Sequence, residues 1–168
     1  MNTETYYTYH DSPIGCLLLT SDGTNLTRLH MIGQRHEAVP DSSWQKNDDL
    51  PIFQTTKQQL DSYFQGELHN FELPLKLEGT DFQKLVWSEL EKIPYGITIS
   101  YGELANRVGN ANASRAVGLA NGKNPIGIIV PCHRVIGASG KLTGYGGGID
   151  RKAKLLNLEA GFGVGSAG

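Results

Sequence analysis

The tripeptide Cys132-His133-Arg134 is the part of the sequence best suited to chemistry. A thiol attacks electrophiles as the thiolate, and an unperturbed cysteine is ionised to only a small extent at neutral pH. Cys132 therefore needs help from its surroundings. Adjacent side chains of an extended segment point to opposite faces, so contact between Cys132 and His133 would require a sharp turn or a bridging water.

A histidine that acts as a base through one ring nitrogen needs a hydrogen-bond acceptor for the N–H of the other. Glu159, on a helix predicted over about residues 150–160, is a candidate acceptor for His133, and the three side chains would then form a relay from Cys132 to Glu159. Two alternatives stay open at this level. Free cysteine is also a common core residue, and a helical glutamate commonly faces solvent.

Composition limits the other classes of protein. Cys16 is the only other cysteine, and none of the five histidines has the i, i+4 spacing of a helical metal pair, so we predict reduced thiols and no metal site. No window approaches the roughly 18 apolar residues of a membrane helix, and the first residues show no signal-peptide pattern. We therefore expect a cytoplasmic protein that does not contact membranes.

Charge divides the chain into an acidic front half and a basic back half. Residues 1–79 hold five Lys and Arg against eleven Asp and Glu, a net charge of -6, whereas residues 80–168 hold ten against six, a net charge of +4. The basic half could neutralise phosphates of a nucleic acid. An uneven but merely solvated surface is the alternative, so the asymmetry alone favours nucleic acid only slightly.

The elements that must position these residues differ between the halves. Strands over 5–10, 16–20 and 26–32 predict an antiparallel meander, followed by a helix from about Phe53 to Phe64 and an extended segment over 71–77.

Helices dominate after Gly79. Capping boxes at Thr80 and Ser100 each begin a helix, and a third helix begins near Asn112 or Ser114 and ends at 121–122, so that two short helices resemble a helix-turn-helix. The first of these helices should bury one apolar face, formed by Phe82, Leu85, Val86, Leu90 and Ile93.

The third helix lacks large side chains on one side. Its spacing groups Ala113, Ala116, Val117 and Ala120 on one face, and Arg115, Gly118, Leu119 and Gly122 on the other. Such a bare face could approach a DNA groove, or it could pack inside the protein. The apolar, largely β-branched run over 126–130 predicts a buried strand that leads into the motif around Cys132.

The motif Pro131-Cys132-His133-Arg134-Val135 resembles the active-site motif of the O6-alkylguanine-DNA alkyltransferases, also called methylated-DNA-protein-cysteine methyltransferases. The resemblance extends without a gap from about Gly79 to Gly161 and includes further matching segments. These are Ile93-Pro94-Tyr95-Gly96, Ser100-Tyr101-Gly102, Arg115-Ala116-Val117-Gly118, Asn124-Pro125, Gly144-Tyr145 and Glu159. The front half is less similar.

The resemblance implies an α/β (α+β) fold with two domains. Residues 1–79 would form an N-terminal ribonuclease H-like α/β domain, and residues 80–168 a mostly helical winged-helix or helix-turn-helix domain that binds the minor groove of double-stranded DNA. Arg115 would fill the gap left by a flipped-out O6-alkylguanine, and Tyr101 would assist the flip. The expected DNA-binding residues are Ser114, Arg115, Ala116, Gly118 and Tyr101.

The implied reaction is an irreversible, stoichiometric transfer of the alkyl group to Cys132, without a cofactor. Tyr101 would protonate the leaving guanine, and Asn124 would support the turn before the nucleophile. The base pocket would consist of the carbonyls of Cys132 and Val135 and the backbone amides of Tyr145 and Gly146. O6-methylguanine, and also O4-methylthymine, are the expected lesions, and a monomer is the default state.

Three rival functions remain to be compared. A non-enzymatic relative that binds alkylated DNA and recruits repair factors carries tryptophan at the nucleophile position, so Cys132 argues against it. A cysteine hydrolase would turn over without DNA, and the helix-turn-helix and the basic half disfavour it. A transcription regulator would need a sensory or dimerisation segment beyond the two halves.

Overall fold

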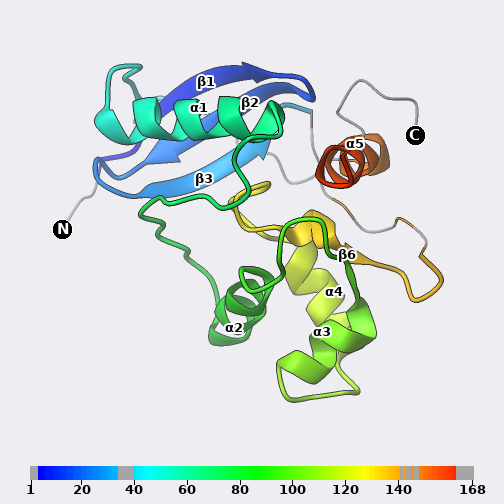
Figure 1. Cartoon of the computed structure of the whole chain (residues 1–168). Coiled ribbons are helices and arrows are strands. Elements are labelled where there is room, and N and C mark those ends of the chain that lie inside the picture. Colours follow the sequence, from blue (N-terminus) through cyan, green and yellow to red (C-terminus); the bar gives the residue numbers. More distant parts are fainter. Residues whose placement is uncertain (1–3, 34–39, 141, 143–144, 146–147, 162–168) are drawn as a thin grey trace.

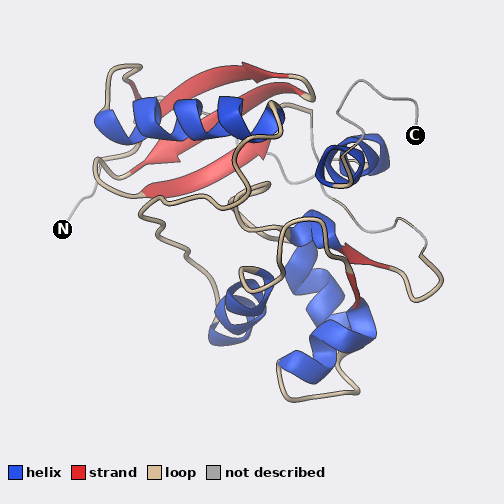
Figure 2. Ribbon diagram, viewed as in Figure 1, coloured by secondary structure: helices blue, strands red, loops and turns tan. Residues whose placement is uncertain are grey.

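The computed structural model describes residues 4–33, 40–140, 142, 145 and 148–161. The front half forms a four-stranded sheet covered by one helix, as Figures 1 and 2 show. Its elements are β1 (Tyr6–Ser12), β2 (Gly15–Ser21), β3 (Leu26–Met31), β4 (Gln45–Lys46) and α1 (Pro51–Phe64). The strand order is β3-β2-β1-β4, with β4 parallel to β1 and the other pairs antiparallel. The predicted meander is confirmed, and its strand boundaries differ by one or two residues.

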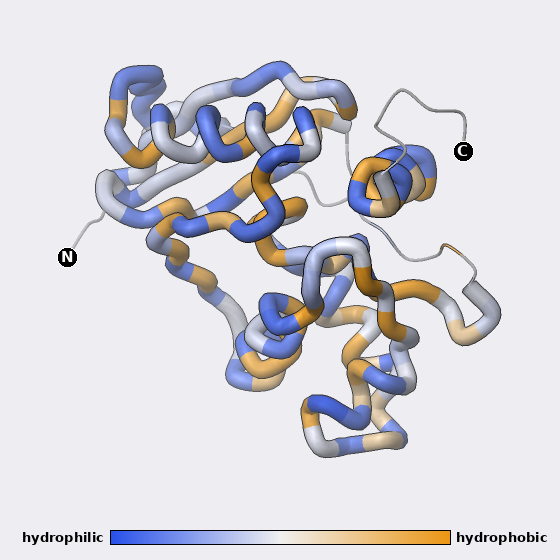
Figure 3. The backbone as a smooth tube through the Cα atoms, in the orientation of Figure 1, coloured by the Kyte–Doolittle hydropathy of each residue, from blue (hydrophilic) through white to orange (hydrophobic). Residues whose placement is uncertain are grey.

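The core of this half lies between α1 and the sheet. Proline at the start of α1 has the fixed φ of a first helical residue, and the helix buries Phe53, Leu60 and Tyr63. Leu17, Leu18 and Leu19 are all fully buried in β2, because both faces of this central strand are covered. In Figure 3, hydrophilic and hydrophobic stretches alternate along α1, as expected of a helix with one buried face.

The back half is mostly helical. Its elements are α2 (Asp81–Leu90), β5 (Ile99–Ser100), α3 (Tyr101–Arg107), α4 (Ser114–Gly122), the 3-10 turn η1 (Cys132–Arg134), β6 (Val135–Ile136) and α5 (Ile149–Glu159). The predicted capping box at Thr80 is present. At Ser100 only half of the predicted box forms: the hydroxyl accepts from the Glu103 amide, and the Glu103 carboxylate bonds Arg107 instead.

No helix in the described part of the chain is long and apolar enough to cross a membrane.

The predicted buried face of α2 is partly wrong. Phe82 and Leu85 are 37% and 44% exposed, and Trp87 is buried instead, alongside Val86 and Leu90. The Trp87 side of α2 faces α4, and the indole Nε1 of Trp87 donates to the Ala120 carbonyl of α4 at 2.8 Å.

The predicted faces of α4 are also partly wrong, because Ala116 is exposed. The residues that α4 buries are Val117, Ala120 and Asn121, while Leu119 is 65% exposed and Gly118 is half-buried. The side of the helix that the spacing left bare, with Arg115, is thus open at its N-terminal end.

Residues 126–130 form a buried turn rather than the predicted strand. Ile126 makes a single bridge to Leu29, after which the Ile129 amide donates to the Gly127 carbonyl at 2.7 Å and the Val130 amide to the Ile126 carbonyl at 3.0 Å. Ile128 adopts a φ of 70°, which is unusual for a β-branched residue. A short apolar run cannot distinguish a buried strand from a buried turn, which explains the error.

The outer edge of the sheet, along β3, binds the segment over residues 74–76 at the end of the front half and the segment at Pro125 from the back half. Next to β3, the Leu26 amide donates to Pro74, and Leu26 accepts from Lys76. Farther along the strand, the Leu29 amide donates to the Pro125 carbonyl at 2.9 Å. These bonds satisfy an edge that would otherwise expose unpaired backbone groups, and they fix the turn before Cys132 against the sheet.

The cap at Thr80 provides a test of this arrangement. Thr80→Ala removes the acceptor for the Gln83 amide, so we expect the free energy of unfolding to fall by about 1 kcal/mol in chemical denaturation. Ser88→Ala, in the same helix, removes an exposed hydroxyl that bonds the Leu85 carbonyl within the helix and caps no helix end, so it should change stability much less. Equal effects of the two substitutions would show that the cap does not determine where α2 begins.

Candidate active site

Asparagine side chains hold the backbone on both sides of Cys132. The Asn124 amide nitrogen donates to the Val130 carbonyl at 2.7 Å, and its Oδ1 accepts from the Ile126 amide at 3.0 Å. Asn121, which the sequence did not single out, donates to the Cys132 carbonyl at 3.3 Å. A sharp turn, η1, is present at Cys132, and Asn124 bonds the backbone of the segment that leads into it.

The carboxylate of Glu159 gathers the residues that follow Cys132. His133 Nε2 lies 2.6 Å from Oε2 of Glu159, and Arg134 bonds both oxygens, with Nε 2.8 Å from Oε1 and Nη2 3.1 Å from Oε2. All three side chains are buried. The contact between His133 and Glu159 that the sequence analysis considered is thus present, and Arg134 is a second partner of the carboxylate.

The buried surroundings of His133 favour a neutral ring. Burial lowers the pKa of His133, and the hydrogen bond and negative charge of Glu159 oppose that shift only in part. Hydrogen bonds from His133 and Arg134 and the positive charge of Arg134 hold the pKa of Glu159 far below its usual range, against the effect of burial. Because an ionised carboxylate only accepts, Nε2 carries the proton and Nδ1 has the free lone pair. Nδ1 is buried, and no described residue bonds it.

The thiol of Cys132 is buried and mostly protonated at rest. Burial raises its pKa, while a hydrogen bond from the Asn124 side chain and the charge of Lys152 act in the opposite direction. A base is therefore needed to produce the thiolate. The free lone pair on the neighbouring imidazole of His133 is suited to this task.

Lys152 is a residue of the site that the sequence reasoning missed. It is fully buried in α5, its Nζ donates to the Val135 carbonyl at 2.5 Å, and burial lowers its pKa to about 8 although the Cys132 thiolate raises it. A signal was available. Lys152, Leu155 and Glu159 have the spacing of one helical face, so the face that carries Glu159 also carries Lys152.

The residues expected to bind DNA lie on α3 and α4. Ser114, Arg115 and Ala116 are all exposed in the first turn of α4. Tyr101 begins α3, with its ring against Gly118, where an added Cβ would lie 3.7 Å from it. Lys152 Nζ lies 6.0 Å from the centre of the same ring. The Tyr101 ring thus lies between Gly118 of α4 and Lys152 of α5.

The expected base pocket is only partly described. Both carbonyls already accept protein hydrogen bonds, that of Cys132 from the Val135 amide and from Asn121, and that of Val135 from Lys152. The Tyr145 hydroxyl lies 3.9 Å from the sulfur of Met31, and burial, together with the nearby Cys132, raises the pKa of Tyr145. Gly146 lies outside the described residues.

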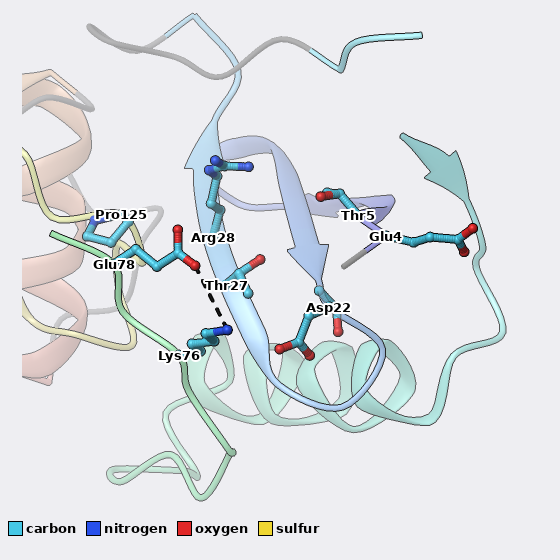
Figure 4. A pocket seen from close by; sticks show the side chains of 9 residues that line it. Glu4, Thr5, Asp22, Thr27, Arg28, Lys76, Glu78 and Pro125 are labelled. Atoms are coloured by element: carbon cyan, nitrogen blue, oxygen red, sulfur yellow. Dashed lines mark ion pairs between the residues drawn. The ribbon is translucent and has the colours of Figure 1, made fainter. Parts of the chain in front are cut away.

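One further hollow and the grouping of possible metal ligands do not resemble a reactive site. A surface hollow beside β3 contains the ion pair between Lys76 and Glu78, and the Asp22 carboxylate at its rim bonds the amides of its own turn (Figure 4). It contains no cysteine or histidine. Across the described ranges, no three His, Cys, Asp or Glu side chains gather closely enough to hold a metal ion.

Both halves of the chain match known protein families. The family described as 6-O-methylguanine DNA methyltransferase, ribonuclease-like domain, matches residues 5–77, and the 6-O-methylguanine DNA methyltransferase, DNA binding domain, matches residues 81–161. The chain belongs to the 6-O-methylguanine DNA methyltransferase family. The predicted family is confirmed, as is the predicted mixed fold with a ribonuclease-like sheet domain and a helical DNA-binding domain.

Relatives from this family are similar over nearly their whole length. The methylated-DNA–protein-cysteine methyltransferase of Methanosarcina acetivorans is 54% identical over 155 residues, 92% of this chain and 97% of that protein. The one from Mycobacterium tuberculosis is 56% identical over 154 residues, 92% of each chain. A crystal structure of Mycobacterium tuberculosis OGT in complex with DNA has a TM-score of 0.86 at 54% identity, covering 94% of both chains.

The buried lysine generates a prediction about pH. In a Cys16→Ala background, Lys152→Met removes the cation that stabilises the thiolate, so we expect the pKa of Cys132 to rise by about one unit. The ultraviolet absorbance of the thiolate across a pH titration measures this shift. Lys154→Met is the control, because Lys154 is exposed on the same helix. A thiol pKa that stays the same in the Lys152 variant would remove Lys152 from the site.

Proposed function

We propose that this protein repairs DNA by moving the alkyl group from O6 of guanine to Sγ of its own Cys132. The observation that carries the proposal is the buried thiol of Cys132, placed in η1 next to the neutral imidazole that Glu159 holds, in a chain of this family. Because a thioether has no easy hydrolytic exit, the transfer is irreversible, and each molecule acts once.

The chemistry balances with the groups on the chain. Nδ1 of His133 accepts the thiol proton, directly or through a water molecule, and the thiolate forms a bond to the alkyl carbon as the bond between that carbon and O6 breaks. The electron pair passes to the guanine, and Tyr101 supplies a proton to the leaving base. Lys152 and Asn124 stabilise the thiolate before the attack.

Residues of α4 and of the expected base pocket support a route by which the damaged base enters the site. The first turn of α4 supplies Ser114, Arg115 and Ala116 to the minor groove of double-stranded DNA, and Arg115 replaces the flipped base in the stack. Val135, Tyr145 and Gly146 then border the base. The carbonyls of Cys132 and Val135, which accept hydrogen bonds from Asn121 and Lys152 respectively, would also accept the exocyclic amine of the base.

The remaining assignments rest on the same family membership. We place the domain boundary between residues 79 and 80, and we assign the protein to the cytoplasm as a monomer without cofactor. O4-methylthymine is a second lesion that this site would accept. A non-enzymatic binder of alkylated DNA is the alternative, and the thiol at Cys132 together with relatives named as methyltransferases disfavours it.

Intact mass spectrometry tests the proposed reaction. One equivalent of duplex containing O6-methylguanine should add one methylene, about 14 Da, to each protein molecule and no more, and Cys132→Ala should gain nothing. If the mass stays constant while the lesion remains bound, the protein is a damage binder. If the duplex is not bound at all, the proposal fails entirely.

Arg115→Ala tests the base-flipping role. We expect the rate of transfer from a duplex to fall about tenfold, while transfer from the same lesion in a short single strand changes little, because only a duplex leaves a gap in the stack. Rapid-quench single-turnover assays on both substrates measure the difference. Arg107→Ala is the matched control, since Arg107 forms an ion pair with Glu103 on α3. Equal losses on both substrates would assign Arg115 to phosphate binding instead.

A further inference from the structure

A tyrosine from the front half reaches the carboxylate of the site. Tyr63, near the C-terminal end of α1, donates its hydroxyl proton to Oε2 of Glu159 at 2.6 Å, across 96 positions of sequence. Figure 1 shows this end of α1 directed toward α5, the helix that carries Glu159. Tyr63 is fully buried, and besides packing in the core of the front half it contacts the reactive site.

Tyr63 shares its acceptor oxygen with the histidine. Oε2 accepts from Tyr63 and from His133 Nε2, each at 2.6 Å, and from Arg134 Nη2 at 3.1 Å, while Oε1 accepts from Arg134 Nε at 2.8 Å and from the Gly96 amide at 3.2 Å. Donors on one oxygen divide its negative charge. Each donor from another residue therefore weakens the attraction of Glu159 for a proton on His133.

The hydroxyl of Tyr63 is fixed in place and remains a donor. Its ring packs edge-on against Phe64, with 5.2 Å between ring centres, and lies 5.3 Å from Phe71 and 6.1 Å from Tyr95. Burial, and then the charge of Glu159, raise the pKa of Tyr63 well above its ordinary value, so the phenol stays protonated at every pH at which the protein would work. The aromatic cluster thus delivers a permanent hydrogen-bond donor to the site.

We propose that Tyr63 is a positioning residue for alkyl transfer, a hydroxyl from the sheet domain that holds Glu159 and limits how strongly this carboxylate draws a proton onto His133. The proposal rests on the function proposed above. It gives the sheet domain an indirect part in the chemistry, through Glu159, because His133 must be neutral at Nδ1 to accept the thiol proton.

Other charged and titratable groups also face this pair. They are Tyr95 from the segment after α2, Cys132 and Arg134 from η1, Tyr145 from the segment before α5, and Lys152 from α5. None of them is altered by replacing Tyr63 with phenylalanine, which keeps the ring and removes only the hydroxyl. Without the Tyr63 hydroxyl, Oε2 of Glu159 loses one donor and attracts the proton on His133 more strongly. This favours the imidazolium, so the pKa of His133 should rise.

Tyr63→Phe is tested by two titrations. We expect the acidic limb of the pH profile for single-turnover methyl transfer to move up by about half a pH unit, which lowers the rate in acid about threefold. The affinity for unreacted duplex should not change. Nitrogen-15 NMR of the His133 ring in the unreacted protein should show a pKa shift of the same size, and this readout does not depend on activity.

Two further variants separate charge sharing from simple packing. Fluorotyrosine at position 63 is a stronger donor in the same ring, so the limb and the His133 titration should move down in pH. Tyr95→Phe is the control, because among the described residues the Tyr95 hydroxyl bonds the Leu158 carbonyl, at 3.5 Å, and not Glu159, so neither titration should move. If Tyr63→Phe and the fluorotyrosine variant both titrate like the wild type, Tyr63 is only structural and the proposal is wrong. A wild type without methyl transfer would overturn the proposed function, and the NMR titration would still decide the role of Tyr63.

Discussion

The buried negative charge of Glu159 is the interaction on which the site depends. An ionised carboxylate away from water is costly unless it is paired and hydrogen-bonded, and here five hydrogen bonds from four residues satisfy it. Two residues come from η1, Tyr63 comes from α1 and Gly96 from the segment after α2. Removing this charge would leave Arg134 buried without its counter-ion, so the geometry around Cys132 and the contact that Tyr63 makes between the two halves depend on the same group.

A protonated resting thiol fits a protein that reacts once. The thiolate is the reactive form, and burial keeps Cys132 protonated until His133 takes the proton, which limits side reactions with other electrophiles. Lys152 supplies a compensating positive charge that is itself weakened by burial. The site thus combines a poor resting nucleophile with a nearby base and a nearby cation, and the thiolate is favoured only within this arrangement.

Local signals in the sequence predicted much of this structure. The strands of the sheet, the cap at Thr80 and the end of α4 could be predicted from residues close together in the sequence. The pairing of His133 with Glu159 was considered because a histidine that acts as a base needs a hydrogen-bond acceptor. The errors concern packing. The turn at Ile128 looks like a strand, because an apolar run is buried in either case, and Phe82 is exposed because Trp87 determines how α2 is turned. Contacts such as that of Tyr63 with Glu159 join distant segments and have no local sequence signal.

The most direct test of the central role of Glu159 is the tautomer of His133. Nitrogen-15 NMR of the ring in the unreacted protein at neutral pH distinguishes the two neutral tautomers from the imidazolium. A proton on Nε2, with none on Nδ1, is the result that follows from a charged Glu159 in contact with Nε2. A proton on Nδ1, or a fully protonated ring, would contradict the account, because His133 could not then accept the proton of Cys132.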